Sequence, residues 1–130
     1  MSNIWIGFKR KEFECKCGCG FATVDAELLE VLKDLRVFFG NNPVYINSAC
    51  RCEEHNANVG GAPKRAGIRS SGSKHMYGIA ADIRVKGFTP DSVAEYLETT
   101  YPDKYGIGRY NTFTHIDVRP VSARWDRRSN

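Results

Sequence analysis

The sequence predicts a single domain that combines helices with strands. Two stretches, within residues 23–40 and 89–102, repeat apolar residues at helical spacing. Four others have the alternation or the β-branched and aromatic content typical of strands: residues 44–48, 79–85, 105–110 and 113–118. Because 130 residues can bury a hydrophobic core without disulfides or metal, we expect residues 1–130 to form one domain.

Both predicted helices have recognisable ends. Thr23 and Asp25 are N-cap candidates for the first helix, and Gly40 is a C-terminal stop. The apolar positions between them recur at helical spacing and are expected to be core rather than a binding groove: Leu28, Val31, Leu32, Leu35, Phe38 and Phe39. Thr89 followed by Pro90 predicts the start of the second helix.

The strand at residues 79–85 alternates between two chemically different faces. Ile83 and Val85 belong to one face, whereas Asp82 and Arg84 belong to the other. We therefore expect Asp82 to point away from the aliphatic core.

Composition and charge exclude some classes of protein. No run of about 18 apolar residues occurs, so we expect no membrane span. The N-terminus lacks the features of a secretory signal peptide, so we expect synthesis in the cytoplasm without one.

The net charge of +4 and pI near 8.9 are compatible with nucleic acid, teichoic acid or peptidoglycan carboxylates as partners. The sequence has no aromatic-basic repeat and no recognisable reading helix, so we do not expect nucleic-acid binding. We interpret the basic tail at residues 124–128 as a solvated terminus.

The five cysteines form two Cys-x-Cys groups: Cys15, Cys17 and Cys19, then Cys50 and Cys52. An odd count without a signal peptide argues against a secreted disulfide framework. The sequence leaves two interpretations open: the cysteines are small buried residues, or a thiolate or disulfide link joins the two groups. A second zinc site is less favoured, because the cysteines of such sites are usually spaced two to four apart. We expect residues 12–15 to be a short extended segment.

Two of the three histidines lie beside carboxylates in a pattern that suits a metal site. His75 precedes Asp82 by seven positions, across a turn into a strand, so a loop and a strand can bring both to one ion. On a single helix they would be about 10 Å apart. His115 and Asp117 point to one face of the last predicted strand. Two imidazoles and one carboxylate with an open position are typical of catalytic zinc, although spacing alone does not exclude hydrogen-bonded histidines.

Several motifs occur in the order found in a known family. They are S-A-C-R at residues 48–51, S-K-H-M-Y-G-I-A-A-D at residues 73–82 and H-I-D-V-R at residues 115–119. Across residues 13–120 the chain resembles the M15 family of zinc D-Ala-D-Ala peptidases, in particular a branch common in bacteriophages. The family is related to lysostaphin-type peptidases and the hedgehog domain. The resemblance implies an α+β fold in which a central antiparallel sheet, flanked by helices, carries one Zn²⁺ ion.

The resemblance also implies roles for individual residues. His75, Asp82 and His115 would be the zinc ligands. Arg51 would be catalytic and substrate-binding, facing the substrate or the developing oxyanion, and Ser48 would lie on the substrate side at the family spacing.

The general base is the point where this sequence departs from better-known relatives. Those relatives place Glu three residues, or His two residues, before the last ligand, where this chain has Thr112 and Phe113. Asp117 is the candidate base. An equal alternative is that Asp117 anchors a histidine or an arginine.

Three further residues have possible places at the site. Tyr77 and Tyr110 flank the ligands and are candidates to line the groove for substrate, although tyrosines on half-buried strands need no such role. We expect His55, the remaining histidine, to be a structural hydrogen-bonding residue rather than a fourth ligand.

The resemblance implies a zinc-dependent peptidoglycan peptidase that hydrolyses a peptide bond next to a D-amino acid in the stem or cross-link. It would be a carboxypeptidase or an endopeptidase, a monomer, and a phage lysis enzyme acting on the cell wall after holin-mediated release or from a virion. The alternative is a non-catalytic zinc-containing binding module of the same fold.

Overall fold

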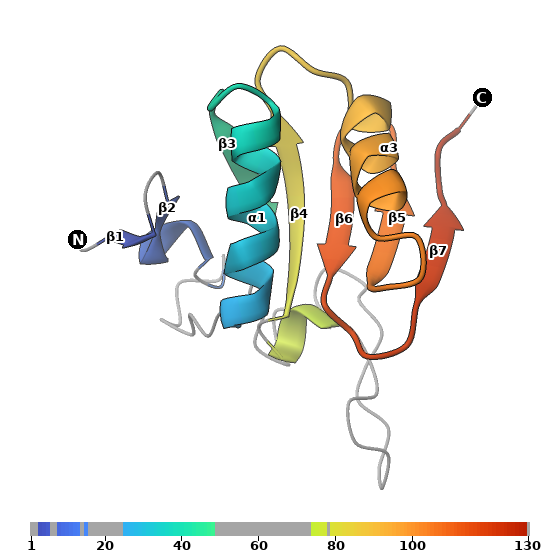
Figure 1. Ribbon diagram of the computed structural model, residues 1–130, viewed down its shortest axis with the longest axis horizontal. Helices are drawn as coiled ribbons and strands as arrows, with labels where there is room; N and C mark the ends of the chain where they lie inside the picture. Colours follow the sequence, from blue (N-terminus) through green and yellow to red (C-terminus); the bar gives the residue numbers. More distant parts are fainter. Residues whose placement is uncertain are drawn as a thin grey trace, which may run out of the picture.

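A five-stranded sheet forms the centre of the computed structural model, which describes residues 3–5, 8–13, 15, 25–48, 74–77 and 79–129 (Figure 1). The strand order is β3-β4-β6-β5-β7. Their bounds are Val44–Ser48 (β3), Ala80–Val85 (β4), Gly106–Arg109 (β5), Thr114–Asp117 (β6) and Ala123–Asp126 (β7). Helices α1 (Ala26–Phe38) and α3 (Pro90–Thr100) lie on one face of this sheet. The predicted α+β class is confirmed, and the four predicted strands are β3, β4, β5 and β6.

Three short elements complete the described chain. The N-terminal strands β1 (Asn3–Trp5) and β2 (Phe8–Lys9) form a separate antiparallel pair. The 3₁₀ helix η1 (Arg10–Phe13) follows directly, and a second 3₁₀ helix, η2 (Lys74–Tyr77), precedes β4. The prediction of an extended segment is wrong at Glu12 and Phe13, because these residues belong to η1.

The helix ends follow from their capping residues. Asp25 caps α1 by accepting a hydrogen bond of 2.8 Å from the backbone N–H of Glu27. After α1, Gly40 has φ of +72°, a left-handed conformation that glycine adopts without strain. Thr89 caps α3 by accepting from the N–H of Ser92 at 3.1 Å, with Pro90 in the first turn. Both predicted helix starts are confirmed.

The hydrophobic core lies between the two helices and the sheet. Three isoleucines from neighbouring strands, Ile83, Ile107 and Ile116, are fully buried against Leu32 of α1 and Leu97 of α3 in one apolar cluster. The apolar stripe of α1 is therefore core, as predicted, with an exception at Phe38, a residue that is 62% exposed.

The alternation of β-strands sends a second set of residues to the face opposite the helices. In register across the sheet, Asp82 pairs with His115, His115 with Gly108, and Gly108 with Trp125. Their neighbours along the strands, such as Ile83 and Ile107, point to the helices. We call this second side the site face.

Strand β7 corrects two expectations about the sheet. It pairs with β5 in parallel, so the sheet is mixed rather than antiparallel throughout. Residues 124–126, interpreted from sequence as part of a solvated terminus, form this edge strand. The guanidinium of Arg124 fastens it by donating to the carbonyls of Tyr101, Lys104 and Tyr105 at 2.5, 2.9 and 2.7 Å. Pairing with the open edge of β5 outweighs the polar character of the segment.

No helix within the described part of the chain has the length and apolar content needed to cross a membrane.

Candidate metal centre

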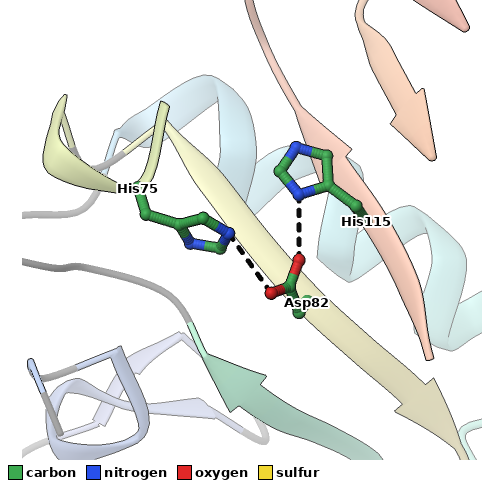
Figure 2. Close-up of side chains that lie close together, drawn as sticks. All are labelled: His75, Asp82 and His115. Carbon is green, nitrogen blue, oxygen red and sulfur yellow. Dashed lines mark hydrogen bonds and ion pairs between the residues drawn. The ribbon is translucent and has the colours of Figure 1, made fainter. Parts of the chain in front are cut away.

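Three segments bring His75, Asp82 and His115 together on the site face (Figure 2). His75 comes from η2, Asp82 from β4 and His115 from β6. The two oxygens of Asp82 face different imidazoles. Oδ2 lies 3.3 Å from Nε2 of His75, and Oδ1 lies 2.9 Å from Nδ1 of His115. One carboxylate thus joins both histidines.

The donor set fits a divalent metal such as zinc. One ligand atom from each of the three residues lies within 4.8 Å of the others. Tetrahedral bonds of about 2.0–2.1 Å to zinc would place ligand atoms roughly 3.4 Å apart. The three residues are protected from solvent, with side-chain exposed fractions of 3% for His75, 11% for Asp82 and 9% for His115. Two imidazoles and one carboxylate are also the chemistry of an open catalytic zinc site.

Asp117 holds the other nitrogen of His115. Its Oδ2 lies 2.7 Å from His115 Nε2, so Nδ1 is left to face Asp82 and His75. A carboxylate bonded to the far nitrogen of a metal-ligating histidine fixes its tautomer and ring orientation. Asp117 therefore lies where it can orient a ligand.

The Asp117 carboxylate is fully buried and fully engaged. Besides His115 it accepts from the backbone N–H groups of Gly106 and Arg119, both at 3.2 Å. The guanidinium of Arg119 binds it in a fork, Nε to Oδ1 and Nη2 to Oδ2, each at 2.7 Å. A carboxylate offers roughly four lone-pair positions, so these five donors leave none of them free for another partner.

The electrostatics of the site follow from these contacts. Burial alone would raise the pKa of Asp82, but hydrogen bonds from His115 and His75 outweigh it and hold that pKa well below its usual value. For Asp117, bonds from His115 and Arg119 likewise outweigh burial and lower the pKa. Burial would lower the pKa of His115, but its bonds to Asp117 and Asp82 raise it. In the metal-free site, both carboxylates therefore favour the protonated form of the His115 imidazole.

Glycines at alternate positions of β5 make room for these groups. A Cβ at Gly106 would lie 2.5 Å from Oδ1 of Asp117 and from Nε of Arg119. At Gly108 a Cβ would lie 2.9 Å from Cζ2 of Trp125 and nearer still to its Nε1 and Cε2 atoms. Glycine within a strand marks the close approach of another group. The Gly-x-Gly pattern was the sequence feature that could have indicated this packing.

The site includes two residues to which sequence reasoning gave no role, Arg119 and Trp125. Arg119 belongs to the H-I-D-V-R motif and forks onto Asp117 two positions earlier, but the room for this fork comes from Gly106, which is in register with Asp117 on β5. Trp125 belongs to the tail that was expected to be solvated, and its ring centroid lies 5.0 Å from that of His115.

The structure describes some of the proposed substrate residues. Ser48 pairs with Asp82 across β3 and β4, after an irregularity in the register, and is half-buried. Tyr77 ends η2, but its side chain lies outside the described part. Arg51 also lies outside the described residues, as do His55 and every cysteine except Cys15, which is buried. Tyr110 stacks on Phe113 with ring centroids 4.4 Å apart.

Comparison with known proteins agrees with this geometry. The Peptidase M15 family model matches residues 6–117, which include all three candidate ligands and Asp117. The chain therefore belongs to the Peptidase M15 family, and this membership supports a metallopeptidase. No curated protein matches the sequence.

Proposed function

We propose that this protein is a zinc-dependent peptidoglycan peptidase that hydrolyses a peptide bond next to a D-amino acid in the stem or cross-link. The observation that carries the proposal is the buried group of His75, Asp82 and His115 in a member of the Peptidase M15 family. These three residues would hold one zinc ion. When bound, zinc supplies Lewis-acid chemistry that polarises a peptide carbonyl and activates water for attack.

The protein's own contribution begins with orientation of the ligands. Asp82 lies between the two histidines, 3.3 Å from Nε2 of His75 and 2.9 Å from Nδ1 of His115. Because the far nitrogen of His115 is held by Asp117, the imidazole is fixed before metal or substrate arrives. Pre-orientation of this kind lowers the free-energy cost of binding.

Of the two roles considered for Asp117, we propose orientation of His115 rather than proton transfer. A general base must reach the proton that it removes and must have a free lone pair. The carboxylate of Asp117 is 0% exposed, and five donors surround it. Its lowered pKa also makes it a weak base near neutral pH.

Three further residues are proposed to act on the substrate. Arg51 would stabilise the developing oxyanion and bind substrate, because a cation aimed at that charge favours the transition state. Ser48, which pairs with Asp82, and Tyr77, which lies two positions after His75, would line the substrate side. These roles come from the resemblance to the family. We further propose that the enzyme is a monomeric phage lysis enzyme that acts on the bacterial cell wall.

Digestion of purified peptidoglycan tests this function. We would incubate it with the native protein, His115→Ala, Arg51→Ala and the matched arginine control Arg127→Ala, determine the zinc content of each, and identify products by mass spectrometry. Native protein and Arg127→Ala are expected to release the same products, because Arg127 is exposed. His115→Ala and Arg51→Ala are expected to release little or none.

The products also separate the alternatives. Free D-alanine would identify a carboxypeptidase, whereas cut stems or cross-links would identify an endopeptidase. A native protein that holds one zinc and leaves the wall and all muropeptides intact would contradict the proposal. That result would favour the zinc-containing binding module.

A further inference from the structure

Besides its two carboxylates and the ring of His75, the imidazole of His115 has a further neighbour within the described part of the chain, the indole of Trp125. We infer that Trp125 is a positioning residue of the metal centre, whose ring holds the His115 imidazole in the orientation that binds metal. This inference rests on the proposed function. It also means that β7, which lies beyond the segment matched by the family model, completes the centre.

The packing of the two rings is direct. Their centroids are 5.0 Å apart with an interplanar angle of 48°. His115 on β6 and Trp125 on β7 are both in register with Gly108 on the intervening strand β5. A side chain at that glycine would overlap the indole, so its absence lets the tryptophan lie across β5 and reach His115.

The indole is itself fixed by a hydrogen bond and an aromatic stack. Its Nε1–H donates to the hydroxyl of Tyr110 at 2.9 Å. The Tyr110 ring stacks on Phe113 at 4.4 Å and 15°, just before β6 begins. A half-buried tryptophan with its N–H bonded has a defined ring position. It can therefore restrain the neighbouring imidazole.

Arg119 contacts both the Trp125 ring and Asp117, the carboxylate that is bonded to His115. The guanidinium carbon of Arg119 lies 5.1 Å from the centroid of the Trp125 ring. The same group forms the fork on Asp117. Arg119 therefore fixes the position of two groups: Asp117, which bonds the Nε2 edge of His115, and Trp125, which packs beside its ring.

Removal of the indole should therefore weaken metal binding without removing a ligand. Without Trp125 the imidazole gains room to rotate away from Asp82, and that freedom is lost again when metal binds. Loss of a group that orients a metal ligand typically lowers affinity about 10- to 100-fold. We expect a change of this size for Trp125→Ala.

The test measures the zinc dissociation constant by competition with a chromogenic chelator. The variants are Trp125→Ala, Trp125→Phe and Arg124→Ala. Arg124 is the matched control, because it fastens β7 on the helix side and does not face His115. We expect about 10- to 100-fold weaker binding for Trp125→Ala and nearly native binding for Trp125→Phe, which keeps an aromatic ring. Arg124→Ala should bind as the native protein does, although it unfolds at a lower temperature.

Two results would overturn the inference. One is native zinc affinity in Trp125→Ala. The other is equal weakening in Arg124→Ala, which would assign the effect to loosening of β7. Both of these results leave zinc binding by the native protein intact and so contradict only the inference. A native protein that binds no zinc would instead contradict the proposed function, so the two failures are distinguishable.

A second measurement does not require removal of Trp125. The chain has two tryptophans, Trp5 and Trp125, so Trp5→Phe leaves Trp125 as the only indole emitter. Cobalt(II) bound at the centre should quench its fluorescence, because the indole packs against a ligand. His115→Ala in the same background should show little quenching. Unchanged emission on cobalt binding in the Trp5→Phe protein would contradict the placement of Trp125.

Discussion

The two faces of the sheet differ in what holds them together. The helix face is apolar, with Ile83, Ile107 and Ile116 buried under α1 and α3. The site face is polar, with Asp117 and Arg119 packed over Gly106 of β5 and the indole of Trp125 packed over Gly108. Because neighbouring residues of a strand point to opposite faces, one strand serves both purposes. Stability and metal binding are therefore expected to respond to different substitutions on the same strands.

The largest expected effect on the site face comes from His115→Ala. Loss of a ligand removes several kcal/mol of transition-state stabilisation, which corresponds to a fall of at least about 10³-fold in activity. Zinc content should fall in parallel, as measured by atomic absorption. His55→Ala, a substitution of the remaining histidine, should retain both. Full activity in His115→Ala would show that this imidazole is not a ligand.

A change of comparable size on the helix face should affect only stability. Ile107 is fully buried, and its neighbours along β5 are Gly106 and Gly108 of the site face. Ile107→Ala should lower the free energy of unfolding by about 2–5 kcal/mol, because it leaves a cavity in the core. Urea denaturation measures this loss. Zinc affinity of the folded protein should stay native, and a large loss would show that the two faces are not independent.

Asp117→Asn should produce a smaller effect that separates the two roles of this residue. The amide has nearly the shape of the carboxylate but loses the charge and one acceptor facing His115 and Arg119. Because we propose that Asp117 orients His115, its substitution should lower the zinc affinity about 10- to 100-fold. Chelator competition with parallel activity assays gives the comparison. Unchanged zinc affinity with lost activity would instead identify Asp117 as the base.

The smallest effect is expected on the helix side at Tyr105. Its hydroxyl donates to Oε2 of Glu27 at 2.7 Å, linking the start of β5 to α1. Tyr105→Phe should cost about 1 kcal/mol at neutral pH. Urea denaturation of both proteins across a pH series checks this value.

The same pair predicts a pH dependence. Burial, with the hydrogen bond and charge of Glu27, raises the pKa of Tyr105. The stabilisation is therefore complete below the ordinary tyrosine pKa of about 10 and is lost as pH rises above it. Stability of the native protein should fall toward that of Tyr105→Phe in this range. A difference that is constant with pH would contradict the assignment.

Local features of the sequence were enough to predict the helix face, and together with the family resemblance they predicted the candidate ligands. The caps Asp25 and Thr89 have strong local preferences, and apolar spacing marks the buried side of α1. The alternation around Asp82 placed it on the face away from the core. These predictions depend on neighbours only a few positions away along the chain.

The support around the ligands could not be predicted in the same way. The contact of Trp125 with His115 depends on the parallel pairing of β7 with β5. This pairing is a long-range interaction, and the polar sequence of β7 does not predict it. The fork of Arg119 on Asp117 is sequence-local, but the room for it comes from Gly106 on another strand. The sequence therefore points to the candidate ligands more readily than to the residues that would orient them.

X-ray absorption at the zinc edge, on native protein loaded with one equivalent of zinc, tests the central claim most directly. Ligation by His75, Asp82 and His115 predicts a first shell of nitrogen and oxygen alone, at about 2.0–2.1 Å. The chain also has five cysteines, and thiolates would scatter at about 2.3 Å. A sulfur shell at that distance would place the zinc on the cysteines and contradict the site proposed on this face of the sheet.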